Sequence, residues 1–272
     1  VGERCVAVES LIFLVTVADA IRPELMRLVP PKTVMDLEVF YDNTVEVVPE
    51  LRNAIYRQFP CITVAMDDVI SNITQMKWDS KELAVRHSSY VDVIQDRFVE
   101  FHGALKQMEW FLPVAMRPFL LRSSVLHVME QLVEGYSRIK KVGPNTPLAM
   151  SNDISTLKLS LQQIPELKPC PFVEHVENFI TGYFFQSTEA SNVILEWVRQ
   201  HPMYTTSQVV GLVTSVLESG SSSSMTSTLK YMNMKGKSQA TKETLQQVQE
   251  ATRTNSLPSS SITFEELCQI ST

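Results

Sequence analysis

The apolar residues of this chain recur mainly at spacings of three and four, which is the period of one face of an α-helix. The longest unbroken series consists of Val91, Ile94, Phe98, Phe101, Leu105 and Met108. After a turn bracketed by Pro113 and Pro118, a second series consists of Leu121, Val125, Val128, Leu132, Tyr136 and Ile139. A short connection between two matched apolar stripes is typical of an antiparallel helical hairpin, which we therefore expect here.

Residues 171–219 carry three shorter apolar series, each the length of one short helix. These series are Val173, Val176, Ile180 and Tyr183, then Ile194, Trp197 and Val198, and then Val209, Val213, Val216 and Leu217. We expect Ser191 or Asn192 to cap the second helix. Thr205 and Gln208 have the spacing of a capping box that opens the third helix. Because helices this short do not persist alone in water, we expect the three to share one small core.

Prolines divide the N-terminal part of the chain into further expected helices. A long helix over residues 6–26 is expected to break near Pro23. Residues 33–58 are expected to form one or two helices that end before Pro60. An amphipathic helix is then expected over residues 62–76.

The whole pattern predicts an all-α chain built as an elongated stack of antiparallel helical bundles, a helical rod. Only eight glycines occur in 272 residues, and the chain lacks the sustained alternation of apolar and polar residues that is typical of strands.

The chain is expected to contain three segments. The cluster of Gly, Pro, Asn and Thr at 143–147 is the clearest internal boundary. It separates a helical-bundle rod segment, 1–145, from a small helical bundle, 146–219. Beyond that, 220–272 begins with a run rich in Ser and Thr, and we expect it to be mostly disordered. Within it, transient helices are expected over 240–251 and 263–270.

Charge and cysteine content narrow the classes of function. The formal net charge of −6 argues against a general nucleic-acid binder, which needs basic surface to displace counterions from phosphates. The four cysteines lie far apart without a CxxC pair, which favours free thiols in a reducing compartment; they are Cys5, Cys61, Cys170 and Cys268. The apolar run 11–18 is too short to span a bilayer. Because the chain begins at Val1, we expect it to be the end of a longer protein.

Patterns that carry chemistry are present only as fragments. Gly236-Lys237-Ser238 matches the end of a phosphate-binding loop, but the glycine required five residues earlier is Tyr231. The pair Asp67-Asp68 is typical of the Mg²⁺ sites of all-α prenyl synthases, yet a second acidic cluster is missing.

The histidines show no metal-site spacing either. They are His87, His102, His127, His175 and His201. They include neither an HExxH motif nor a Cys/His pair at zinc spacing, and a site formed by Cys170 and His175 is a weak alternative. We therefore expect the chain to have no catalytic, cofactor-binding or metal-binding residue, no cofactor and no small-molecule substrate.

Five aromatic residues near the C-terminal end have two interpretations: Tyr183, Phe184, Phe185, Trp197 and Tyr204. Aromatic side chains dominate the energetics of protein interfaces, so the five are candidates for a partner-binding patch. At helical spacing, packing in a core is the commoner role, and we favour it. Three consecutive aromatic rings at 183–185 cannot all face the same way, so we expect one of them to be exposed or covered by a neighbouring helix.

Several short segments resemble one family of proteins when they are taken in order. They read ERCVAVESLIFL at 3–14, LRNAIYRQF at 51–59, MKWDSKEL at 76–83, HSSYVDV at 87–93 and LVEGYSRIKK at 132–141. The last part of the chain adds VENFITGYF, EWVRQHPMYT and VGLV between residues 176 and 213. This series resembles the C-terminal part of the syndetin family over residues 1 to about 218. The Ser/Thr-rich tail departs from the short basic helix with which the family ends.

The resemblance implies a function that the residue pattern alone does not. Syndetin is a subunit of the endosome-associated recycling tether, which is related to the Golgi-associated retrograde complex. It implies a non-enzymatic scaffold acting in endocytic recycling from endosomes to the plasma membrane. The implied partners are other tether subunits, SNAREs and small GTPases. The implied location is cytoplasmic and peripheral, on recycling endosomes or trans-Golgi network membranes. The alternatives are a subunit of another helical-rod tether, Golgi retrograde or exocyst-like, and an all-α prenyl-transfer enzyme.

Overall fold

The computed structural model describes residues 2–79, 86–108, 112–114, 116–185, 191–219 and 242–253. Throughout these residues the regular structure is helical, which confirms the all-α prediction. Some sequence features lie outside the described residues: the fragment 236–238, the segment 263–270 and Cys268. Residues 242–253 form a helix with Val248 buried, in agreement with the helix expected over 240–251.

The described residues divide into two compact units. The first takes in residues of 2–65 and 97–124, and the second those of 66–96 and 125–253. The first unit contains α1 (Gly2–Leu28), α2 (Val34–Phe40), the π-helix η1 (Tyr41–Val45) and α3 (Val48–Thr63). The second contains α4 (Asp67–Gln75), α7 (Thr146–Leu161), η2 (Pro165–Leu167), α8 (Val173–Thr181), η3 (Gly182–Phe184), α9 (Ser191–Gln200) and α10 (Thr206–Ser219). Two long helices, α5 (Ser89–Gln107) and α6 (Met116–Ser137), contribute to both.

The predicted hairpin of α5 and α6 is confirmed. Near the start of α5, Tyr90 shares a hydrogen bond of 2.7 Å with Tyr136 near the end of α6. Arg117, near the start of α6, donates a 3.1 Å hydrogen bond to His102 in the second half of α5. The helices therefore run antiparallel. Both predicted stripes are buried, except that Met108 lies just beyond α5 and is half-buried.

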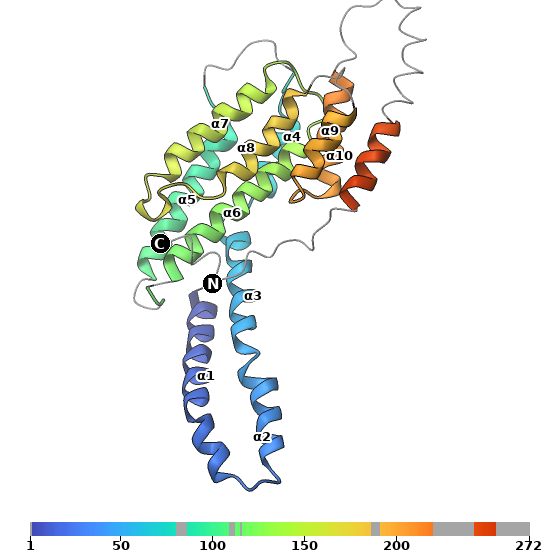
Figure 1. Ribbon diagram of the computed structural model, residues 1–272. Helices are drawn as coiled ribbons and strands as arrows, with labels where there is room; N and C mark the ends of the chain where they lie inside the picture. Colours follow the sequence, from blue (N-terminus) through green and yellow to red (C-terminus); the bar gives the residue numbers. More distant parts are fainter. Residues whose placement is uncertain are drawn as a thin grey trace, which may run out of the picture. The chain divides into compact units, whose positions relative to one another are not determined.

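In the first unit, α1 and α3 form a second antiparallel hairpin, drawn in blue in Figure 1. Cys5 and Val8 of α1 are buried, as are Tyr56 and Phe59 of α3. The ring of Tyr56 meets Phe119 edge to face, with ring centroids 5.9 Å apart. These contacts give the hairpin an apolar core at the end of α1 where the chain begins.

Two prolines lie inside helices that we expected them to interrupt. Pro23 lies within α1, which continues to Leu28, and its ring is exposed, so the helix loses one hydrogen bond where water is available. Pro60 lies in the last turn of α3, which continues to Thr63, and its carbonyl accepts a 2.8 Å hydrogen bond from the amide of Val64. The expected helix over 62–76 therefore begins later, at Asp67.

The second unit is closed by the three short helices predicted near the C-terminal end. The buried faces of α8 and α9 are those expected from the sequence. In α10, Leu212 is fully buried, whereas Leu217, which we expected to face inward, is only half-buried. The buried face of α10 is therefore rotated by part of a turn from the expected one. The capping box is confirmed: the amide of Thr205 donates to Gln208 Oε1 at 3.0 Å, and the amide of Gln208 donates to Thr205 Oγ1 at 3.3 Å.

The Gly/Pro-rich segment at 143–147 is held against Trp78 and Asp79, which follow α4 in the sequence. The hydroxyl of Thr146 donates to the carbonyl of Trp78 at 2.6 Å, and the amide of Gly143 donates to that hydroxyl at 2.8 Å. A Cβ atom on Gly143 would lie 3.1 Å from the Cα of Asp79, so glycine allows this close approach. The expected division of the chain near residue 145 stays a proposal.

Candidate partner-binding surfaces

Three of the five aromatic residues singled out from the sequence are buried in the core of α8, α9 and α10. The indole Nε1 of Trp197 donates to Thr181 Oγ1 at 3.1 Å. The hydroxyl of Tyr204 donates to the carbonyl of His175 at 2.7 Å, and the hydroxyl of Tyr183 to the carbonyl of Tyr136 at 2.7 Å. Buried polar atoms need such partners, so these three side chains meet the requirements of core packing.

The rings themselves form a compact aromatic cluster. Trp197 lies nearly parallel to His201, with ring centroids 4.6 Å apart, and to Tyr204 at 5.7 Å. Phe179 meets Tyr204 edge to face at 5.1 Å. Burial also raises the pKa of the Tyr183 and Tyr204 phenols, so both stay protonated at neutral pH.

The other two residues of the set lie closer to the surface. Phe185 is half-buried and meets Trp197 edge to face at 6.0 Å. Phe184 leaves 55% of its surface exposed, so it is the ring of the consecutive three that faces outward. A partner-binding role for Tyr183, Phe184, Phe185, Trp197 and Tyr204 stays a prediction, and Phe184 is its most accessible member.

The residues with candidate metal or nucleophile chemistry form no metal-binding group in the described part of the chain. Within the described ranges, no group of three or more His, Cys, Asp or Glu side chains could hold a metal ion. Asp67 and Asp68 occupy the first turn of α4. Cys170 and His175 are each removed from water, which raises the pKa of the Cys170 thiol to about 11 and lowers that of the His175 imidazole. A thiol with a raised pKa is a poor metal ligand and nucleophile.

A further apolar surface, which the sequence did not lead us to expect, lies along α1. The exposed large apolar side chains of α1 are Val6, Leu11, Phe13, Leu14, Val17, Ile21 and Leu28. Since the opposite side of α1 packs on α3, this helix is apolar on both faces. The signal was present in the sequence, because apolar residues on more than one side of a helix leave one side for a further partner.

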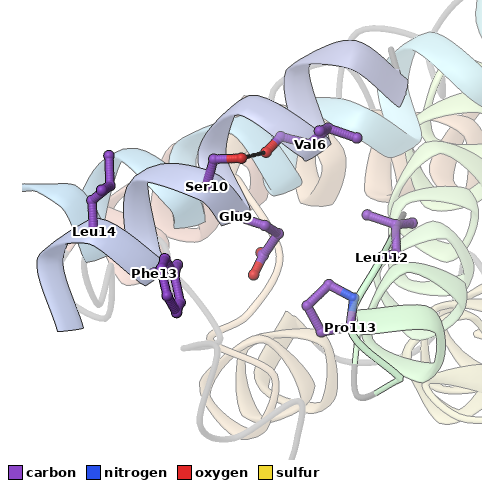
Figure 2. Close-up of a pocket in the computed structure, with 7 residues that line it drawn as sticks. All are labelled: Val6, Glu9, Ser10, Phe13, Leu14, Leu112 and Pro113. Carbon is purple, nitrogen blue, oxygen red and sulfur yellow. Dashed lines mark hydrogen bonds between the residues drawn. The ribbon is translucent and has the colours of Figure 1, made fainter. Parts of the chain in front are cut away.

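A hollow of about 570 Å³ opens on this surface between α1 and residues 112–113 (Figure 2). Figure 2 shows Phe13 and Glu9 on the α1 side, facing Leu112 and Pro113. The hydroxyl of Ser10, which also lines the hollow, donates to the carbonyl of Val6 at 2.8 Å.

The carboxylate of Glu9 is already satisfied within the hairpin. Arg52 of α3 donates to both of its oxygens, at 2.8 and 3.0 Å, and the hydroxyl of Tyr56 donates at 2.7 Å. A bidentate pair of this kind fixes the two helices in one register. Because its one charged group is neutralised, the hollow is suited to apolar side chains and offers no free charge to a small ionic ligand.

Comparison with known proteins settles the family. A family model described as "Syndetin, C-terminal" matches residues 1–233. The chain belongs to the syndetin C-terminal family. The resemblance found in short segments of the sequence is thereby confirmed over all the helices from α1 to α10.

The similarity to full-length syndetins covers only one region of those proteins. The chain is 29% identical to syndetin of Rattus norvegicus over 220 residues, which are 80% of this chain and 22% of the relative. It is 28% identical to syndetin of Mus musculus, over 80% of this chain and 22% of the relative. It is also 28% identical to syndetin of Gallus gallus, over 80% of this chain and 23% of the relative. The chain thus spans about a fifth of the length of the curated relatives it matches. No solved structure matches the chain.

No helix in the described part of the chain combines the length and the apolar character needed to cross a bilayer.

Proposed function

We propose that this chain is a non-enzymatic scaffold segment of a vesicle-tethering complex that acts in endocytic recycling from endosomes to the plasma membrane. Membership of the syndetin C-terminal family, over residues 1–233, is the observation that carries the proposal. The partners are the other subunits of the tether, together with SNAREs and small GTPases. Attachment to recycling endosomes or the trans-Golgi network takes place through these partners.

The surfaces of the described helices support a role in binding proteins. Apolar side chains are exposed along α1 and α2, and Phe184 is exposed beside the aromatic cluster. Contiguous exposed apolar patches on a folded protein are typical of sites that bind other macromolecules. The hollow beside α1 is lined mainly by apolar groups and offers no unpaired charge, which fits a docking surface better than a substrate pocket.

Capture of the tagged chain from cells tests this function. The expected result is co-purification of the other subunits of the endosomal recycling tether in fixed proportion to the chain. The Phe184→Ser variant tests the aromatic patch, because it removes an exposed ring without opening the core. Weaker capture by this variant supports a partner site at Phe184, and unchanged capture places the partners elsewhere. Failure of the wild-type chain to capture any tether subunit would overturn the proposed function.

A further inference from the structure

The exposed surface of α2 and η1 combines apolar side chains with uncompensated negative charge. Met35 is 73% exposed, and Val39 and Phe40 are each 51% exposed. Between residues 34 and 51 the sequence contains five carboxylates and no Lys or Arg. We call the surface formed by Met35, Glu38, Val39 and Asp42, which share one side of the helix at spacings of three and four, the acidic apolar face.

The carboxylates of this face lack partners in the described part of the chain. Of the five in this stretch, Glu46 pairs with Arg22 at 3.2 Å. The other four form no ion pair with any described residue; they are Asp36, Glu38, Asp42 and Glu50. The nearest cation along α3, Arg52, is bound by Glu9. The negative charge is therefore available to a partner.

The backbone under this face is pinned to α1. Tyr41, the first residue of η1, is 1% exposed, and its hydroxyl donates to the carbonyl of Ala18 at 2.7 Å. The guanidinium of Arg22 lies over its ring, 4.7 Å from the centroid. Phe40 packs edge to face on the same ring at 5.7 Å. Because Tyr41 is fixed inward, Val39 and Phe40 are held outward, and π-turns of this kind are frequent at functional sites.

We propose that the acidic apolar face docks a basic amphipathic helix of a partner protein. Met35 and Val39 are four residues apart, so they form one stripe, and Glu38 and Asp42 lie beside it with the same spacing. A helix with an apolar stripe flanked by Lys or Arg complements both features. An anionic membrane surface does not, because it repels the carboxylates that surround the stripe.

Synthetic helical peptides test the charge requirement on the full chain. Two peptides share one leucine stripe, and one carries lysine flanks while the other carries glutamate flanks. By fluorescence anisotropy, the lysine peptide is expected to bind about tenfold more tightly or better. Its affinity should fall as salt is raised, because salt screens exposed charges. Equal binding of the two peptides would overturn the proposal.

Matched variants then place the binding on this face. Glu38→Lys with Asp42→Lys should weaken the lysine peptide about tenfold, and Val39→Ser should weaken both peptides. The controls are Asp96→Lys with Glu100→Lys, and Val99→Ser, on the exposed side of α5, where Val99 is 71% exposed. All variants should melt as the wild type does. Controls that weaken binding as much as the test variants would contradict the assignment.

Two other occupants of the acidic apolar face, a second copy of the chain and a membrane, would give different results in these experiments. If Val39→Ser abolishes self-association measured by sedimentation velocity, the face is occupied by a second copy, and the proposal fails. If it abolishes binding to phosphatidylserine vesicles, the face is a membrane site, and the proposal also fails.

The inference rests on the proposed scaffold function, yet the two can fail separately. A wild-type chain that binds the lysine peptide but captures no tether subunit overturns the function alone. A chain that captures the subunits but shows no preference for the lysine peptide overturns the docking face alone.

Discussion

Trp197 shows how one residue type can support two opposite interpretations. From sequence, a Trp near two Tyr and two Phe can be an interface anchor or a core residue, and helical spacing favours the core. Its surroundings separate the two roles, because its indole donates to Thr181 and its ring lies on His201 and Tyr204. Trp197 is 7% exposed, whereas Phe184 is accessible, so Phe184 is the better candidate for direct contact with a partner.

Replacing Trp197 by Ala is expected to destabilise the protein by about 3–5 kcal/mol, because it leaves a cavity in the core of α8, α9 and α10. Phe184→Ala is the matched control and should change the free energy of unfolding by less than about 0.5 kcal/mol. Denaturant unfolding followed by circular dichroism measures both. An unchanged transition for the Trp197 variant would mean that the ring does not hold this core together.

Protonation of His175 makes the stability of the same core depend on pH. Burial lowers the pKa of its imidazole in the folded protein, and the ring packs on Tyr204 with centroids 5.1 Å apart. The unfolded chain therefore binds a proton at His175 more readily than the folded protein does. The contribution of His175 to the free energy of unfolding is fully present above about pH 6.5 and is lost as the pH falls toward the lower folded pKa.

The His175→Gln variant should consequently lose less stability than the wild type on acidification. Denaturant midpoints at about pH 7.5 and about pH 5.5 make the comparison, since these values bracket the ordinary histidine pKa. If the variant and the wild type lose the same amount, titration of His175 does not control the acid response.

Among the elements, α10 packs directly on the backbone at the end of α6. A Cβ atom at Gly211 would lie 2.0 Å from the carbonyl oxygen of Ser137, so glycine at this position sets the distance between the two helices. By contrast, a Cβ at Gly103 in α5 would have open space within 4 Å.

Gly211→Ala should destabilise the protein by about 1–3 kcal/mol, because one helix must move to admit the methyl group. Gly103→Ala should instead stabilise it by about 0.5–1 kcal/mol, because alanine restricts the unfolded chain and favours helix. Thermal melts of the two variants should shift in opposite directions. Shifts in the same direction would contradict the close packing of α10 on α6.

The helices themselves were largely predictable from the sequence. The stripes of α5 and α6 follow strict helical spacing, and the capping box of α10 depends only on Thr205 and Gln208. The ends of α1 and α3 were not predictable, because a proline removes only one hydrogen bond, and packing of the rest of the helix decides whether it continues. Pro23 and Pro60 are both tolerated for this reason.

The candidate surface was only partly predictable. The aromatic set was visible in sequence, but which ring faces outward depends on how η3 turns at Gly182. The acidic apolar face required the structure, because the π-helix and the inward position of Tyr41 determine which side of α2 is exposed.

At the scale of the whole molecule, the fold depends on apolar contacts and on side-chain hydrogen bonds between helices, including the charged pair of Arg52 and Glu9 in the first unit. Melting curves with a chelator, with Mg-ATP and with neither should coincide, because the described residues hold no group that could bind a metal ion and the phosphate-loop fragment lacks its first glycine. A ligand that bound the folded state would raise the melting temperature by mass action. A shift of several degrees with either addition would contradict a scaffold that folds without a metal ion or nucleotide.

Exchange of segments between relatives tests the central claim most directly. In cells that lack syndetin, the segment of rat syndetin that is similar to this chain is replaced by this chain, and the return of an internalised receptor to the plasma membrane is timed. The chimera is expected to restore the recycling rate of the intact rat protein, and rat syndetin truncated before this segment is expected not to. A chimera that assembles with the other tether subunits but recycles as slowly as the truncated protein would contradict the account.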